Sequence, residues 1–414
     1  MSGQRDVVIA GGGMAGISLA LQLGQVLPAS TRICLVEGFA LPPASASVPD
    51  YHPSFDARST ALSYSSQRIY QDMGVWPALQ RWLCPIDTIH VSSRGHFGST
   101  ELRASDHAWP ALGHVVENPW LGRALLHTLQ QQGRVELLNP ATVVAATPVA
   151  GGVDLRLEGA APAALRTSLL VLADGTESGL RKSLGVVAEE KNYRQHALVC
   201  NVAFAEPHRG CAYERFTAQG PLALLPLLPV SGAEHRSGLV WTLPPEQAAL
   251  LQACSEEEFQ RALQQRFGYR LGRVTQVGER HSYPLSLRHC EEQVRAGIVV
   301  MGNAAHTLHP VAGQGFNLAL RDIAALGSVL AAAADAGVAP GSLPVLQRYW
   351  QRQRRDQQKT IQFSDRLPAL FMQSSPLVGL ARDLALSGLD WVAPLKRAFV
   401  RHAAGIQAME GADG

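Results

Sequence analysis

The chain alternates short, fully apolar runs with longer segments of helical period. Residues 7–10, 169–172 and 297–301 have the length and composition of strands that are buried on both faces. Each run leads into a glycine-containing turn, and a segment of helical spacing follows. This order of strand, turn and helix predicts an α/β fold built on a parallel sheet.

A second pattern occupies the middle of the chain. Here strands of irregular alternation are expected at residues 86–92, 195–205, 213–217, 222–229 and 237–243. They predict a mixed or antiparallel sheet that is inserted into the first pattern. Residues 255–267 predict a helix, in which Ser255 and Glu258 form a capping box.

The C-terminal part of the chain predicts helices. Residues 349–366 are polar and rich in arginine, which favours a solvated helix packed through Trp350 and Phe363. Residues 367–400 are more apolar, and both core packing and a membrane-surface or partner-docking element remain open for them.

The first strand runs directly into a glycine turn that fits G-x-G-x-x-G. The first glycine permits a tight turn, the second lets the backbone approach a pyrophosphate, and the third packs the helix on the strand. A second strand at residues 32–36 is followed by an acid that can bind a ribose. An ordinary β-α-β turn could share the glycines, but the acid favours a dinucleotide site. The candidate cofactor residues are Gly11, Gly13, Met14, Ala15, Gly16 and Glu37.

Two further motifs follow the other buried strands. Residues 173–181 read A-D-G-T-E-S-G-L-R and resemble D-G-x-x-S-x-x-R, although Asp174 could also be a plain helix cap. Residues 302–318 read G-N-A-A-H-T-L-H-P-V-A-G-Q-G-F-N-L and resemble G-D-A-A-H-x-x-x-P-x-x-G-Q-G-x-N. Both are signatures of the aromatic-ring flavoprotein monooxygenases, and the resemblance implies FAD as the cofactor.

The resemblance also implies roles for individual residues. Asn303 replaces the family's Asp at the ribityl chain, which keeps an acceptor oxygen and loses the charge. Arg58 is expected near the isoalloxazine and Arg123 on the FAD phosphates, although either could be an ordinary surface arginine. The remaining candidates for contact with the flavin are Asp174, Pro310, Gly313, Gln314, Gly315, Phe316 and Asn317.

The fold implied by the resemblance is that of p-hydroxybenzoate hydroxylase. A Rossmann-like FAD-binding domain is expected at residues 1–80, 110–183 and 288–335. A smaller mixed or antiparallel substrate-binding domain is expected at residues 81–109 and 184–287, interleaved with the first. Residues 336–414 would form a helical C-terminal segment.

Asn303 and the Leu308-His309 pair resemble the ubiquinone-pathway hydroxylases, in particular the 2-octaprenyl-6-methoxyphenol hydroxylase subgroup. This implies hydroxylation of 2-polyprenyl-6-methoxyphenol to 2-polyprenyl-6-methoxy-1,4-benzoquinol through a flavin C4a-hydroperoxide, with O₂ and transiently bound NAD(P)H. Asp174 and Arg181 lie in the segment implicated in nucleotide binding. A monooxygenase for another aromatic or terpenoid substrate, or a non-catalytic FAD-binding scaffold, remains an alternative. His306 and His309 suit packing or cofactor contact as well as proton transfer, so no catalytic residue is predicted.

The composition bears on the binding partners and on the cell compartment. The 36 basic and 34 acidic residues give a net charge of +2 without charged blocks, which argues against a nucleic-acid partner. The six cysteines are dispersed without C-x-x-C pairs, which favours free thiols in a reducing compartment and no metal. Neither a signal peptide nor a transmembrane helix is expected. We therefore expect a cytoplasmic protein, with peripheral membrane contact and association with other ubiquinone-pathway enzymes left open.

Overall fold

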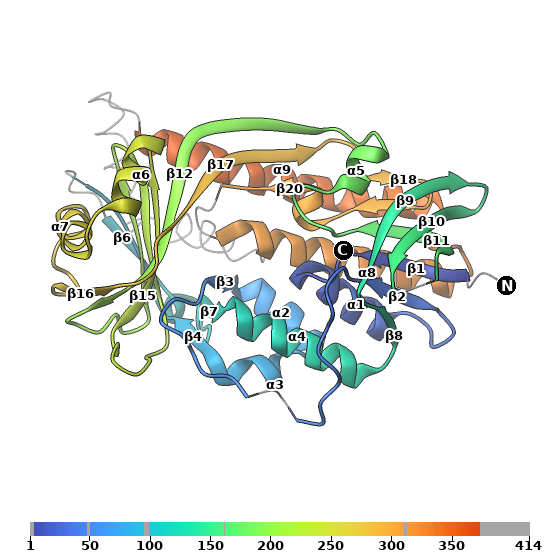
Figure 1. Ribbon diagram of the computed structural model, residues 1–414, viewed down its shortest axis with the longest axis horizontal. Helices are drawn as coiled ribbons and strands as arrows, with labels where there is room; N and C mark the ends of the chain where they lie inside the picture. Colours follow the sequence, from blue (N-terminus) through green and yellow to red (C-terminus); the bar gives the residue numbers. More distant parts are fainter. Residues whose placement is uncertain (1–3, 48–49, 95–98, 161, 310–312, 373–414) are drawn as a thin grey trace.

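The computed structural model describes residues 4–47, 50–94, 99–160, 162–309 and 313–372, and the side chains of this range up to residue 366 (Figure 1). The three buried runs form parallel neighbours in an eight-stranded sheet of order β18-β19-β11-β1-β2-β8, to which β10 and β9 are added beside β11. The strands are β1 (Gln4–Ala10), β2 (Ile33–Val36), β8 (Val135–Leu138), β9 (Ala141–Val149), β10 (Gly152–Gly159), β11 (Ala164–Leu172), β18 (Val294–Arg295) and β19 (Ile298–Val300).

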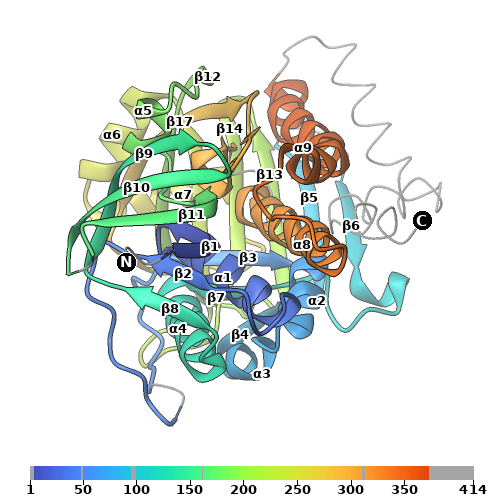
Figure 2. The same cartoon turned by 90° about the vertical axis from the view of Figure 1, so that its right-hand side faces the viewer.

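Both faces of this sheet are covered, which explains why its central strands are apolar without alternation. The helices α1 (Met14–Val26), α4 (Asn118–Gln132) and α8 (Gln314–Asp335) pack on one face. The hairpin β9–β10 and the short helix α5 (Gly179–Ser183) pack on the other (Figure 2). Helix α8 is long and apolar enough to cross a membrane, but 67% of its most apolar window is buried inside the protein. It is therefore the core helix of this fold.

The second sheet has nine strands in the order β20-β17-β12-β15-β14-β13-β5-β6, with β16 beside β12. Its pairs are antiparallel except that β13 and β5 run parallel, so the expected mixed sheet is present. The strands are β5 (Thr88–Ser93), β6 (Ser99–Arg103), β12 (Ala188–Phe204), β13 (Cys211–Thr217), β14 (Gly220–Pro226), β15 (Arg236–Leu243), β16 (Val274–Val277), β17 (His281–Cys290) and β20 (His306–Thr307).

Two helices, α6 (Pro245–Ala253) and α7 (Glu256–Phe267), cover the outer face of the nine-stranded sheet, which places its opposite face toward the parallel sheet. The capping box predicted at α7 is confirmed, since Ser255 accepts from the Glu258 N–H and the Glu258 carboxylate accepts from the Ser255 N–H. This cap starts α7 at the residue that the sequence predicts.

A small three-stranded sheet lies between the two larger ones and has no clear signal in the sequence. Its order is β3-β7-β4, so it pairs segments far apart in the chain. Its elements are β3 (Ser59–Ser63), β4 (Leu83–Ile86) and β7 (Gly113–Glu117), with the helices α2 (Tyr64–Asp72) and α3 (Trp76–Leu79) between β3 and β4.

Helix α9 (Leu343–Met372) corrects the expectation for the C-terminal part. Trp350 and Phe363 are half-buried, but the segment is not simply solvated, because a stripe of its polar side chains is buried next to Tyr349. That stripe stays buried because it pairs with α8, where Arg321 bonds to Asp356 at 2.7 Å and to Thr360 at 3.0 Å. The buried polar residues of the stripe are Gln353, Gln357, Thr360 and Ser364.

Candidate active site

The carboxyl ends of β1 and β11 meet so closely that a side chain would not fit between them. A Cβ on Gly11 would lie 2.5 Å from the carbonyl oxygen of Ala173, and Gly11 has φ +105°, which only glycine adopts easily. The first two motifs therefore share one edge of the sheet. In open α/β sheets this edge is where ligands bind.

The glycine turn has a closed side and an open side. A Cβ on Gly16 would lie 1.8 Å from the Gly11 carbonyl oxygen, so Gly16 permits the packing of α1 on the turn. A Cβ on Gly13 would meet no atom within 4 Å. The backbone at Gly13 and the first amides of α1, at Met14 and Ala15, thus leave room for a phosphate group. The geometry fits the pyrophosphate expected there.

Glu37 stands beside this turn at the end of β2. Its Oε2 accepts from the Gly12 N–H at 2.6 Å, and its Oε1 accepts from the Phe39 N–H at 2.9 Å. Each oxygen keeps a further lone pair for a ribose hydroxyl. The acid predicted from its spacing is therefore at the sheet edge that also carries the glycine turn.

The second motif is fixed by its own hydrogen bonds. Ser178, and not Asp174, caps α5 by accepting from the Arg181 N–H, while the Ser178 hydroxyl donates to Asp174 at 2.7 Å. Burial raises the pKa of Asp174. The guanidinium of Arg181 is 4% exposed and donates to the Ala304 carbonyl at 2.7 Å, so it ties this motif to the third.

The third motif follows β19. Gly302 has φ +60° and precedes Asn303, whose side chain is exposed at the sheet edge. Gly313, in the left-handed conformation, precedes α8, so that the first amides of α8 belong to Gln314, Gly315 and Phe316. The predicted contact residue Pro310 lies outside the described residues.

Asn317 holds the start of α8 against β3. Its Oδ1 accepts from the Ser63 N–H at 2.9 Å and from the Ser66 hydroxyl at 2.6 Å. Its amide donates to the carbonyls of Ala61 at 2.9 Å and of Gly313 at 2.8 Å. All four hydrogen bonds of Asn317 are to other groups of the protein, so its side chain stabilises the turn at the start of α8.

The two histidines of the third motif are both buried. His306 is 1% exposed, and its Nε2 lies 2.7 Å from Asp322 Oδ2 on α8. His309 packs edge-on against the Tyr193 ring at 5.1 Å, and burial lowers the pKa of His309 to about 4. His309 is therefore neutral at physiological pH.

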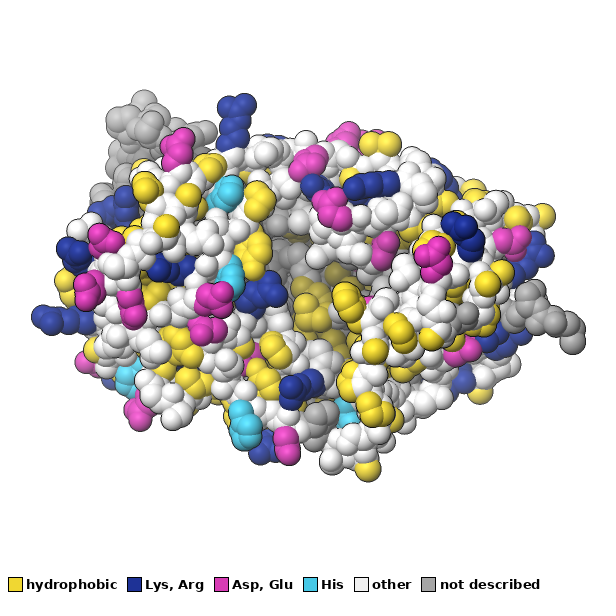
Figure 3. Space-filling model, in the orientation of Figure 1, with side chains coloured by type: hydrophobic (Ala, Val, Ile, Leu, Met, Phe, Trp, Pro, Cys, Tyr) yellow, Lys and Arg dark blue, Asp and Glu magenta, His cyan; other side chains and the backbone are white. Residues whose placement is uncertain are grey.

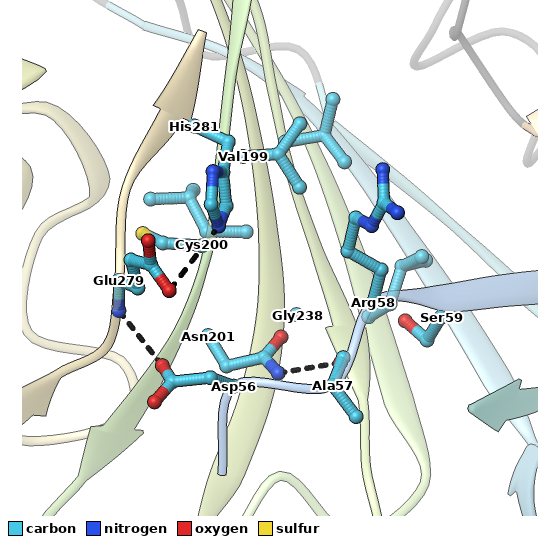
Figure 4. A pocket seen from close by; sticks show the side chains of 13 residues that line it. Asp56, Ala57, Arg58, Ser59, Val199, Cys200, Asn201, Gly238, Glu279 and His281 are labelled. Atoms are coloured by element: carbon cyan, nitrogen blue, oxygen red, sulfur yellow. Dashed lines mark hydrogen bonds and ion pairs between the residues drawn. The ribbon is translucent and has the colours of Figure 1, made fainter. Parts of the chain in front are cut away.

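Arg58 lies just before β3, on the side of the nine-stranded sheet. It lines a cavity of about 40 Å³ against Val199, Gly238 and His281 of the nine-stranded sheet (Figure 4). Its guanidinium also donates to the Tyr283 hydroxyl at 3.1 Å. Figure 3 shows the molecule hollowed at its centre, where the two larger sheets face each other, with apolar side chains inside.

Arg123 is placed by different contacts from those expected. It is exposed on α4, donates to the Asp50 carbonyl at 2.6 Å and lies over the ring of Tyr51. These contacts attach it to the loop before Arg58 and not to the glycine turn.

The same loop is anchored by a buried ion pair that sequence patterns do not indicate. Arg236 of β15 is 1% exposed and pairs with Glu117 of β7, which is 6% exposed. Arg236 also donates to the carbonyls of Ser54 and Leu228, and Tyr51 donates to Glu117.

Comparison with known proteins identifies this arrangement. Residues 4–364 match the family described as FAD binding domain. The chain belongs to this FAD-binding family. Ubiquinone hydroxylase UbiL of Rhodospirillum rubrum is 35% identical over 405 residues, which cover 97% of this chain and 89% of the relative. The 3-demethoxyubiquinol 3-hydroxylase of Escherichia coli is 33% identical over 97% of this chain and 98% of its own length.

Solved structures agree with the fold of this FAD-binding protein. The p-nitrophenol 4-monooxygenase PnpA of Pseudomonas putida superposes with a TM-score of 0.75, at 18% identity, over 98% of this chain and 99% of its own. PqsL of Pseudomonas aeruginosa gives 0.74, at 22% identity, over 92% and 100%. The predicted family, its α/β fold and its FAD cofactor are therefore confirmed.

Proposed function

We propose that the protein is an FAD-dependent monooxygenase that hydroxylates the ring of a polyprenylated phenol in ubiquinone biosynthesis. The observation that carries this proposal is the likeness, over almost the whole chain, to ubiquinone hydroxylases from different organisms. By that likeness the substrate would be 2-polyprenyl-6-methoxyphenol, and the product 2-polyprenyl-6-methoxy-1,4-benzoquinol.

The cofactor-binding residues follow from the convergence of the three motifs. Gly13 and the start of α1 would take the pyrophosphate, Glu37 the ribose, and Asn303 the ribityl chain. The start of α8 would face the flavin ring, since its amides are positive partners for it. Bound FAD would supply the redox chemistry that activates O₂, with NAD(P)H as the reductant and O₂ as the source of the oxygen atom.

The protein's own contribution would be to bind the phenol beside the flavin and to exclude water. Arg58 and the inner face of the nine-stranded sheet enclose one end of the cleft. An apolar cleft suits a prenylated ring, whose transfer from water is favourable in proportion to the apolar area that it buries.

A specific observation favours a second substrate. The Escherichia coli relative is named for hydroxylation of 3-demethoxyubiquinol, which is a different ring position. Quinone-lipid mass spectrometry of a deletion strain separates the two candidates. Accumulated 2-polyprenyl-6-methoxyphenol supports the first substrate, accumulated demethoxyubiquinol supports the second, and an unchanged ubiquinone level contradicts both.

Flavin binding by the glycine turn has its own test. Because a Cβ at Gly13 meets no protein atom, Gly13→Glu should fold but block the pyrophosphate. We expect a colourless protein with the circular dichroism spectrum of wild-type apoprotein. Flavin absorbance retained at the wild-type level would contradict the assignment of this turn.

The division into an FAD-binding and a substrate-binding domain, and the setting in the cell, belong to the same proposal. An enzyme of lipid-soluble phenols would work in the cytoplasm at the membrane surface, beside other enzymes of its pathway. Sedimentation of the purified protein with phospholipid vesicles tests the membrane contact, and an excess of free protein at every lipid concentration would contradict it.

A further inference from the structure

Glu214 is an acid on the inner face of the nine-stranded sheet. Side chains alternate along a strand, so the two neighbours of Glu214 on β13 show its direction. The Tyr213 ring contacts Phe267 of α7 at 5.2 Å, and Arg215 donates to the Arg266 carbonyl at 3.0 Å. Both neighbours thus point to the outer, helix-covered face. Glu214 points the opposite way, toward the cleft.

The row of residues across the sheet at Glu214 is unusual for the middle of a sheet. Cross-strand register puts residues of the neighbouring strands β5, β14, β15 and β12 beside Glu214 on the same face. All of them are aliphatic, and all are only half-buried. These side chains form a partly exposed row on the face turned toward the cleft, and we call this row the slot. The row consists of Val91, Glu214, Ala223, Val240 and Val199.

The rows on either side of this slot are covered. On one side, Asn201 donates to the carbonyls of Phe55 and Ala57, and Ala212 is buried in a hydrophobic cluster to which Leu225 and Ala61 of β3 also belong. On the other side, Phe216, Thr242 and Ala197 are 1%, 1% and 3% exposed. The slot therefore follows the central row, and at β15 and β12 it joins the cavity that Gly238 and Asn201 of the neighbouring row also line.

One end of the slot opens at the proposed flavin position. Val199 and Val240 line the cavity that contains Arg58. Gly313, which begins α8, lies against Ala61 on the covered row next to the slot. A ring placed beside the flavin could therefore lie over the aliphatic floor with an edge toward Glu214.

Glu214 lacks a partner among the described residues. Its Oε1 is inaccessible to water and accepts no hydrogen bond there. A buried acceptor without a donor is costly, which points to a donor supplied by a ligand. A phenolic hydroxyl is such a donor, and the aliphatic floor suits the ring that carries it.

We propose that Glu214 accepts the hydrogen bond of the substrate's phenolic hydroxyl and takes its proton. This inference rests on the proposed function. The phenolic O–H bond breaks, its electron pair stays on the phenolate oxygen, and the proton forms the O–H bond of the Glu214 carboxylic acid. The resulting phenolate is the more electron-rich ring and is therefore the better acceptor of an electrophilic oxygen.

The environment of Glu214 suits a base that works near neutral pH. Burial alone raises the pKa of Glu214 to about 7. The facing residues of β5 and β14, Val91 and Ala223, carry no charge. From α9, Asp365 is bound by Lys191 and Tyr193, and Arg366 is exposed.

The test uses purified holoenzyme, NAD(P)H and 2-methoxy-6-(3-methylbut-2-enyl)phenol, with product and flavin measured separately. Glu214→Gln keeps the shape and removes the basicity. We expect FAD content and flavin reduction to be unchanged, and hydroxylation to fall about 100-fold or more. The matched control is Glu101→Gln, at an exposed acid of β6 that pairs with Arg103. It should hydroxylate like wild type.

The pH profile separates a base from a residue that only supports the fold. Hydroxylation by wild type should rise with pH through about 7, because the carboxylate is the active form, and this rise should be lost in Glu214→Gln. Glu214→Asp should restore part of the rate together with the rise.

Three results would count against these ideas, in different ways. Wild-type hydroxylation together with an unaffected Glu214→Gln, or a Glu214→Gln that keeps the wild-type pH profile, overturns the role of Glu214 alone. A wild-type holoenzyme that does not hydroxylate any prenylated phenol overturns the proposed function. If Glu214→Gln does not retain FAD, the test uses Glu214→Asp instead. A hydroxylation rate of Glu214→Asp that does not depend on pH would then overturn the inference.

Discussion

The buried pair Arg236–Glu117 makes a quantitative prediction. Arg236→Met keeps most of the side-chain volume but removes the guanidinium. Glu117 then keeps only the Tyr51 hydroxyl and the Ser54 N–H, at 3.2 Å, as partners. Breaking a buried pair on one side costs about 3–5 kcal/mol, since an uncompensated charge stays behind. The free energy of unfolding should fall by that amount.

This cost can be converted into a melting temperature. An unfolding entropy of about 2.1 cal/mol/K per residue, over 414 residues, gives about 0.9 kcal/mol/K. The expected decrease in Tm is therefore about 3–6 °C, measured by circular dichroism on the apoprotein. Flavin affinity should fall as well, because Arg236 holds the Ser54 carbonyl of the loop that leads to Arg58.

Two control variants make the prediction refutable. Arg103→Met breaks an exposed pair with Glu101 and should cost less than about 1 kcal/mol. Adding Glu117→Gln to Arg236→Met should recover part of the loss, since the amide leaves no unpaired charge. If Arg103→Met lowers Tm as much as Arg236→Met, or if the double variant loses the sum of the single losses, the charge argument is wrong.

Three further predictions follow from the packing. Gly16→Ala should prevent soluble expression or lower Tm strongly, because its Cβ would lie 1.8 Å from a backbone oxygen, and a Tm like that of wild type would contradict this. Asn317→Ala should cost about 2–4 kcal/mol in denaturant unfolding and weaken FAD retention, since it leaves buried partners without hydrogen bonds. Burial lowers the pKa of His114 and of His309 to about 4, so the unfolded chain binds more protons between pH 6.5 and 4. The free energy of unfolding should therefore fall as the pH decreases through this window, and it should fall less in the double variant His114→Asn with His309→Asn. An equal dependence of the unfolding free energy on pH in wild type and double variant would count against this.

The features that the sequence predicts well are local ones. The glycine spacing at Gly11, Gly13 and Gly16 places a strand, a turn and a helix in a fixed order, and the structure has β1 and α1 there. The capping box at Ser255 works in the same way. In both cases the residues of the motif are close together in the sequence, and the structure that they specify is formed by the same short segment.

The features that cannot be predicted from the sequence depend on contacts between residues that are far apart in the chain. Glu117 and Arg236 are 119 residues apart, and neither lies in a pattern that marks burial. In the sequence, the glutamines of α9 have the pattern of a solvent-exposed helix face. They are buried because α8 packs beside them. Glu214 occupies an ordinary polar position of an alternating strand, and only the cross-strand register shows that its face is the floor of a cleft.

The long strand β12 has a mechanical consequence. It spans 17 residues, about 55 Å, and pairs with β17 along both halves, from beside the parallel sheet to the far side of the nine-stranded sheet. The two ends of the molecule are thus joined by a two-stranded ribbon whose pairing is interrupted at one place. Its register shifts between Asn192 and His196, where Arg194 has φ +53°. A widening of the cleft would bend the ribbon at this bulge, next to Tyr193 and His309, so the stiffness of this short segment is one resistance that such an opening would meet.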